Sequence, residues 1–198
     1  QFVTGTQRAP KVSFTVAGVP EGDNAYELSP ARLRPLRSTR VTGGTQIVLG
    51  TLNRDALVVF KQDPRMLRSL KARLAQNGRR AAQVVRDLAA ARLAAHDAHV
   101  ARLGQIGRTQ PATAEARAQA QSDLRHCDAL AASAHDKAYD HARDALEIAR
   151  QIERVYWEQA TAAPNYALAD PLTASFATLA DHYRFRNDVG AARHSENR

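Results

Sequence analysis

The sequence is poor in cysteine, in large apolar side chains and in long apolar runs. Its single cysteine, Cys127, excludes an internal disulfide and a zinc site built from cysteines. One Trp, one Met, five Phe and five Tyr leave few large side chains for a core. No apolar run approaches the roughly 18 residues of a membrane span, which does not favour a membrane partner. The 44% hydrophobic and 24% charged content is nevertheless that of a globular protein rather than of a disordered chain.

Positive charge is concentrated in the middle of the chain. The net charge is +8; residues 64–110 carry ten basic and two acidic side chains, whereas residues 111–163 carry six basic and nine acidic ones. We expect these segments to fold against each other and neutralise much of the positive field, which does not favour nucleic acid as a partner. The alternative is nucleic-acid binding through an arginine-rich first helix. Its candidate residues are Arg65, Arg68, Arg73, Arg79, Arg80 and Arg86.

Residues 1–63 have the pattern of a small antiparallel β-sheet. Alternating apolar and polar residues predict a strand over 11–17. The Gly43-Gly44 pair separates two strand-like runs and predicts a hairpin, and the most apolar run, 56–60, is expected to be the central strand. Further short strands are expected around 26–28 and 33–36, the second as an edge strand because it contains Pro35.

The same region carries a series of turn and strand motifs. They are Pro20-Glu21-Gly22, Tyr26 to Pro30, Leu33 to Leu36, Arg40 to Gly44 and Ala56 to Val59. Over residues 10–63 this series resembles the accessory β-sandwich module of bacterial glycoside hydrolases and of glycoside-hydrolase-like secreted proteins. The resemblance implies an extracellular or periplasmic location, a catalytic-like domain upstream in the same parent chain, and carbohydrate as a candidate ligand. The family's catalytic carboxylates have no counterpart here.

Residues 64–163 have the pattern of a long antiparallel helical hairpin that resembles a coiled coil. Asp63-Pro64 is a typical helix start, and we expect this first arm to continue through Asn77-Gly78, although a break there is the alternative. Pro111 is expected to open a second arm that ends before Pro164.

Apolar heptads in both arms predict the register of this hairpin. A seam through Leu74, Val84 and Leu88 in the first arm would face a seam in the second arm, and Asn77 would meet His141. In this register the end of the second arm returns to the start of the first.

Large side chains are expected to collect where the second arm returns. A third, shorter helix is expected from Asp170-Pro171 to about Val189, and it would add Leu172, Phe176, Leu179 and Tyr183 to a core beside the sheet. The other members of that core would be Met66, Leu67, Leu70, Ile148, Ile152, Val155, Tyr156 and Trp157.

Candidate chemistry is sparse. His96 and His99, like Asp123 and His126, are three residues apart on one helix, but a metal site of the carboxylate type needs glutamates that the first arm lacks. We therefore predict no metal, no cofactor and exposed histidines, with Cys127 as a small core residue. Ser133, His135 and Asp136 are too close along one helix to form a triad. Tyr156 and Trp157 remain as candidate contacts for carbohydrate or a partner, although core packing is the preferred interpretation.

The sequence thus predicts an α+β protein in three parts: a β module over 1–63, the helical hairpin over 64–163, and a short helix with a C-terminal tail over 164–198. Because the first residue is Gln1 rather than Met, we expect a processed product or a fragment of a larger protein. The favoured function is a non-catalytic accessory module of an exported carbohydrate-active protein, with the hairpin as spacer or docking arm. The first alternative is a coiled-coil module for interaction or self-association, and the oligomeric state stays open.

Overall fold

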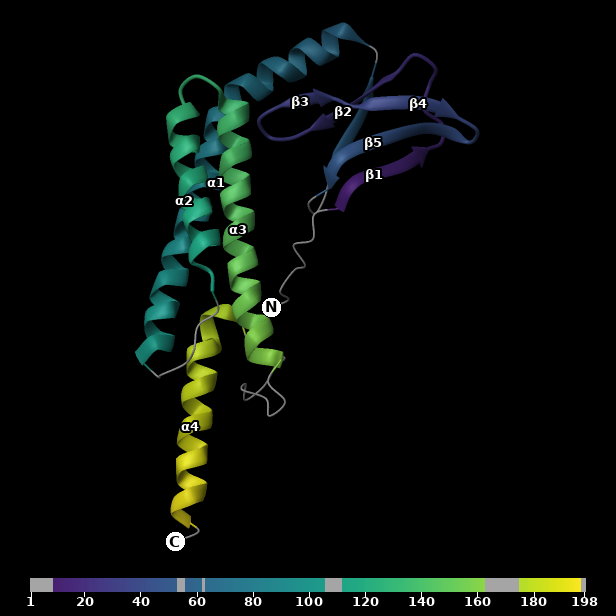
Figure 1. Ribbon diagram of the computed structural model, residues 1–198. Helices are drawn as coiled ribbons and strands as arrows, with labels where there is room; N and C mark the ends of the chain where they lie inside the picture. Colours follow the sequence, from purple (N-terminus) through teal and green to yellow (C-terminus); the bar gives the residue numbers. More distant parts are fainter. Residues whose placement is uncertain (1–8, 53–55, 62, 106–111, 163–174, 197–198) are drawn as a thin grey trace. The chain divides into compact units, whose positions relative to one another are not determined.

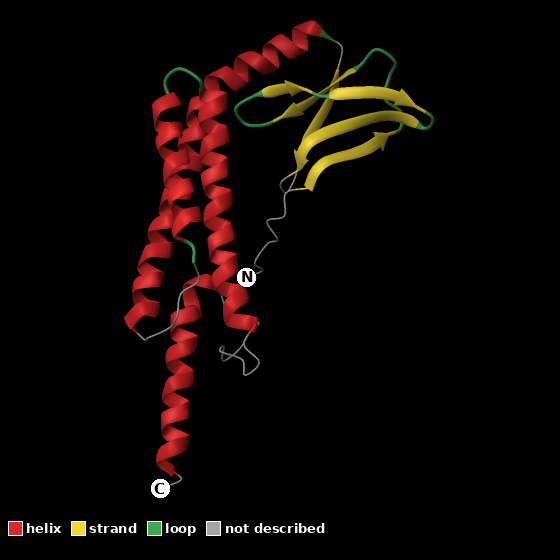
Figure 2. Ribbon diagram, in the orientation of Figure 1, coloured by secondary structure: helices red, strands yellow, loops and turns green. Residues whose placement is uncertain are grey.

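The computed structural model describes residues 9–52, 56–61, 63–105, 112–162 and 175–196 (Figure 1). The chain divides into two compact units, each of which we treat on its own. The sheet unit comprises residues 6–85 and 126–142, and the bundle unit comprises 1–5, 86–125 and 143–198. Small antiparallel sheets followed by long helices confirm the α+β class (Figure 2).

Six strands form two three-stranded antiparallel sheets in the sheet unit. The first sheet has the order β1-β5-β4, and the second has the order β3-β2-β6. The strands are β1 (Ala9–Val16), β2 (Asn24–Leu28), β3 (Leu33–Pro35), β4 (Arg37–Val41), β5 (Gly44–Leu52) and β6 (Leu57–Lys61). The run expected to be central, β6, is therefore an edge strand, and β5 is central in the first sheet, where Ile47 and Leu49 are buried. Pro35 lies on an edge strand, as predicted.

The predicted hairpin at Gly43-Gly44 joins β4 to β5. Gly43 has a φ of 91° and Gly44 a φ of 153°, values that favour glycine. A Cβ atom on Gly44 would lie 2.3 Å from the carbonyl oxygen of Val16 on the paired strand β1. Glycine at this position therefore permits both the turn and the close approach of β1.

Four α-helices and one short 3-10 helix follow the sheets. They are α1 (Pro64–Gln105), α2 (Ala114–Leu130), α3 (His135–Ala162), η1 (Phe176–Thr178) and α4 (Leu179–Glu196). The predicted start of α1 is confirmed, because Asp63 accepts a hydrogen bond from the backbone N–H of Arg65 at 2.9 Å. α1 runs without a break through Asn77-Gly78, as expected.

The second predicted arm is two helices rather than one. α2 ends at Leu130, and a turn over residues 131–134 leads into α3. Figure 1 shows α2 running against α1, which is the predicted hairpin, and α3 turning back beside it. In the bundle unit Arg92 pairs with Glu153, and His96 contacts Tyr156, so residue numbers rise together along α1 and α3. These two helices are therefore parallel.

The parallel course of α3 corrects the predicted register. In the sheet unit a Cβ on Gly78 would lie 3.3 Å from the Cβ of His135, which places the start of α3 beside this part of α1. Asn77 is exposed, and His141 instead contacts His126, with 5.1 Å between ring centroids. The predicted pair of Asn77 and His141 is wrong.

From Ala82 onward, the buried positions of α1 are displaced by about one residue from the predicted seam. Val84 and Leu88 were expected to be buried, but they are 51% and 44% exposed. The buried positions are instead Ala82, Ala89, Leu93, His96, His99 and Leu103. In the sheet unit Ala82 packs against Cys127, Ala138 and Ala142, which confirms Cys127 as a small core residue.

The predicted core at the end of the second arm is only partly formed. Ile152, Tyr156, Leu179 and Tyr183 are buried in the bundle unit, whereas Met66 is 48% exposed and belongs to the sheet unit. The start of α1 and the end of α3 belong to different units. The expected start of the third helix at Asp170-Pro171, with Leu172, lies outside the described residues; α4 itself continues past Val189 to Glu196.

Candidate functional site

Two histidines and two aromatic rings form a buried cluster in the bundle unit, which we call the histidine cluster: His96, His99, Tyr156 and Phe176. α1 supplies both histidines on one face, α3 supplies Tyr156, and η1 supplies Phe176. The ring of His96 stacks on Phe176 at 5.8 Å with 6° between planes, and that of His99 lies 4.4 Å from Phe176. Tyr156 meets His96 edge-on at 5.2 Å. Three helical segments therefore converge on the two imidazoles.

The imidazoles are buried, and no described residue forms a hydrogen bond with them. His96 is 3% exposed and His99 is 2% exposed, so the prediction of exposed histidines is wrong for both. Within residues 9–52, 56–61, 63–105, 112–162 and 175–196, none of their four ring nitrogens has a hydrogen-bond partner. The closest carboxylate oxygen, Oδ1 of Asp97, lies 3.5 Å from Nδ1 of His96, beyond normal hydrogen-bond length. Asp97 is itself paired with Arg117 at 2.5 Å.

Burial determines the protonation of the cluster. Burial lowers the pKa of His99 to about 4, and the positive charge of Arg102 acts in the same direction. Burial also lowers the pKa of His96, although the neighbouring Asp97 opposes this shift. For Tyr156, burial raises the pKa of the phenol, and a hydrogen bond to Thr113 opposes it. At neutral pH the cluster therefore holds two uncharged imidazoles and a protonated phenol.

This arrangement gives the two histidines a packing role among the described residues. A general base needs to reach the proton that it removes, but both imidazoles are covered by Tyr156 and Phe176. Within the described ranges, neither histidine belongs to a group of three potential metal ligands. The predicted absence of a metal stays a prediction.

A groove in the sheet unit is the second place where polar side chains gather. Its volume is about 360 Å³, and its polar lining includes Arg32, Lys71, Ser133, His135 and Asp136. Nδ1 of His135 is engaged with the carbonyl oxygen of residue 131 at 2.8 Å rather than with a carboxylate. The orientation that a triad requires is therefore missing. The guanidinium of Arg32 is likewise engaged, because it donates a hydrogen bond to the carboxylate of Asp140.

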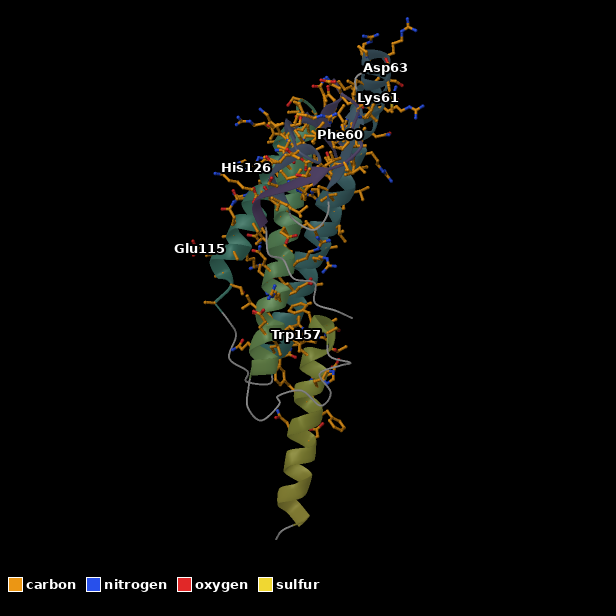
Figure 3. All side chains as sticks on the ribbon, turned by 90° about the vertical axis from the view of Figure 1, so that its right-hand side faces the viewer. Phe60, Lys61, Asp63, Glu115, His126 and Trp157 are labelled. Atoms are coloured by element: carbon orange, nitrogen blue, oxygen red, sulfur yellow. The ribbon has the colours of Figure 1, made fainter. Side chains whose placement is uncertain are left out.

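Two aromatic candidates and one buried carboxylate complete the set of residues singled out in the sequence. Tyr156 is 4% exposed inside the histidine cluster, so it cannot offer its ring to a sugar, and the preferred packing role agrees with its position. Trp157 is half-buried near the C-terminal end of α3 (Figure 3). Asp123 is buried in the bundle unit and accepts a hydrogen bond from Gln119 at 3.2 Å.

The sequence identified the spacing of His96 and His99 but not their burial. Their positions coincide with the true apolar stripe of α1, in phase with Ala89 and Leu93. A helical stripe continued by two histidines is the signal that could have revealed the cluster. No protein-family model, no curated protein and no solved structure matches this chain.

Proposed function

We propose that this chain is a non-catalytic structural module of a larger protein, in which the long helices act as a spacer or docking arm. The observation that carries the proposal is the closed state of the histidine cluster. A site with two imidazoles and a phenol has the groups for acid–base chemistry, yet here aromatic rings fill the space where a substrate would lie.

The distribution of charge supports the same proposal. In the bundle unit Arg92 donates to both carboxylate oxygens of Glu153, at 2.9 and 2.6 Å, and thereby links α1 to α3. Arg117 links α2 to α1 through Asp97. These charged side chains join helices to one another rather than converging on a pocket.

No helix in the described part of the chain has the length and hydropathy of a membrane span.

The resemblance of residues 10–63 to glycoside-hydrolase accessory modules extends the proposal to a parent chain that is exported and acts on carbohydrate. The direct experiment is to read the parent gene on both sides of this sequence. A catalytic barrel upstream is the expected result, and a parent gene without such a domain would contradict this part of the proposal. Affinity electrophoresis in gels that contain soluble polysaccharides tests the ligand class, with Trp157→Ala as the variant that should lose any retardation.

Self-association is the second candidate function, and exposed apolar side chains favour it. In the bundle unit Leu88 is 44% exposed and Phe185 is 59% exposed, and such residues can form contacts between copies. Sedimentation velocity across the micromolar range decides between a monomeric spacer and a self-associating module. A constant monomer mass is expected for a spacer, whereas a mass that rises with concentration, and falls for Leu88→Glu or Phe185→Glu, would establish self-association.

A further inference from the structure

The first part of α1 carries positive charge that the fold does not neutralise. Residues 64–85 contain six basic and no acidic side chains. Five of the basic ones are exposed arginines that form no ion pair with any described residue: Arg65, Arg68, Arg73, Arg79 and Arg80. The expected neutralisation by acidic residues therefore does not reach this segment. Arg86 differs, because it is half-buried and lies 3.4 Å from Asp87.

The arginines form two rows along the exposed face of this helix. With Arg65 as reference and about 100° per residue, Arg68 and Arg79 fall about 40–60° to one side, and Arg73 and Arg80 fall about 60–80° to the other. All are exposed, and Figure 3 shows nitrogen-tipped side chains projecting outward from the helix beyond Asp63. The segment therefore presents one row of guanidinium groups on each side of a central strip.

The strip between the rows is narrow and polar. It contains Arg65 at its N-terminal end, followed by Ser69, Ala72 and Gln76, all exposed. Small and amide side chains at the centre of the strip allow the helix to approach the base edges of a nucleic acid closely. Glutamine can form hydrogen bonds with the edge of adenine in the major groove. On the opposite side of the helix Leu67, Leu70 and Leu74 are half-buried, and Gly78 approaches Ala31 and His135 within the sheet unit. The arginine-bearing face is therefore the more exposed side of this segment.

These dimensions match duplex DNA. An α-helix about 10–12 Å across fits the major groove of B-form DNA, which is about 12 Å wide. In that position two rows of arginines face the two phosphate backbones that border the groove, while the central strip faces the base edges. The A-form groove of duplex RNA is too narrow to admit a helix.

We propose that the exposed face of residues 65–80 binds duplex DNA by entering its major groove, with the two arginine rows on the phosphates. This inference is independent of the structural role proposed above. Four phosphate contacts, one for each arginine of the two rows, predict that log K falls with log salt concentration with a slope of about −3 to −4.

The test measures binding of the whole chain to a fluorescent DNA duplex by anisotropy over a salt series. The variants are Arg68→Gln/Arg79→Gln and Arg73→Gln/Arg80→Gln, each of which removes one row. The matched control is Arg125→Gln/Arg184→Gln, which removes two exposed arginines of the bundle unit. Circular dichroism of every variant monitors helix content, which glutamine preserves on an exposed helix face.

Each row variant should bind about tenfold or more weakly at low salt, with the salt slope reduced by about 2, and the control should bind like the original chain. Equal losses in the control would overturn the proposal, because the effect would then follow net charge alone. No binding at low salt, equal affinity for duplex RNA, or binding to anionic vesicles without binding to DNA would also overturn it.

Discussion

The histidine cluster predicts a specific loss of stability in mild acid. His99 is 2% exposed, has no hydrogen-bond partner in the part of the chain that the structure describes, and has its pKa lowered by burial from 6.5 to about 4. In the unfolded chain the imidazole is solvated and titrates near its ordinary value. Between these two pKa values the unfolded state binds the proton and the folded state does not. The stability is therefore fully present above about pH 6.5 and is lost as the pH falls toward about pH 4.

The magnitude follows from the shift in pKa. A difference of about 2.5 units corresponds to about 3 kcal/mol, of which about 2 kcal/mol is lost between about pH 7 and pH 5. His96 contributes in the same direction, because burial also lowers its pKa. The charged groups that act on the two rings are Asp97 and Arg102 on α1, Arg117 on α2, Glu153 on α3 and Asp181 on α4. Their opposing signs leave burial as the largest influence on both rings.

The assay is urea unfolding at a series of pH values, followed by circular dichroism. His99→Phe retains an aromatic ring against Phe176 and removes the titrating group. Between about pH 7 and pH 5 this variant should therefore lose about 2 kcal/mol less of its free energy of unfolding than the original chain does. His182→Gln, on α4 outside the cluster, is the control for the loss of a histidine. Identical pH profiles for His99→Phe and the original chain would refute the reasoning.

Three further predictions concern packing. Gly44→Ala should destabilise the protein by about 2 kcal/mol or more, because the added Cβ would meet a backbone carbonyl at 2.3 Å. Gly50→Ala, where no described atom lies within 4 Å of an added Cβ, should change the stability by less than about 1 kcal/mol. Urea unfolding midpoints compare the two variants. Gly78→Leu should cost about 1–3 kcal/mol, because even a Cβ there is tight, and thermal unfolding measures it. A double-mutant cycle on Arg92 and Glu153 should give a coupling of about 0.5–1 kcal/mol, and a value near zero would show that the pair does not join the helices.

Local signals in the sequence were sufficient for the individual elements. Turn chemistry at Gly43-Gly44 and the cap at Asp63 act over a few residues, so both were predictable. The break between α2 and α3 was not, because residues 131–134 are Ala-Ala-Ser-Ala and contain neither glycine nor proline. There the packing of α3 beside α1 overrides the helix propensity of alanine.

Alanine also explains why the seam of α1 and the candidate site were misplaced. Alanines stand at 81, 82, 89, 90 and 91, so two adjacent faces have nearly the same hydrophobic pattern. The choice between them depends on contacts far along the chain, such as that of Tyr156 with the histidines. Once the seam shifts by one residue, His96 and His99 move from the surface to the interior.

Chemical labelling of the histidines tests most directly whether the cluster is a closed core rather than an open active site. Diethyl pyrocarbonate acylates accessible neutral imidazoles, and peptide mass mapping assigns each modified residue. The account predicts that His126, which is exposed, reacts rapidly while His96 and His99 remain unmodified in the folded chain and react only after unfolding. Rapid modification of His96 or His99 in the folded chain would contradict it.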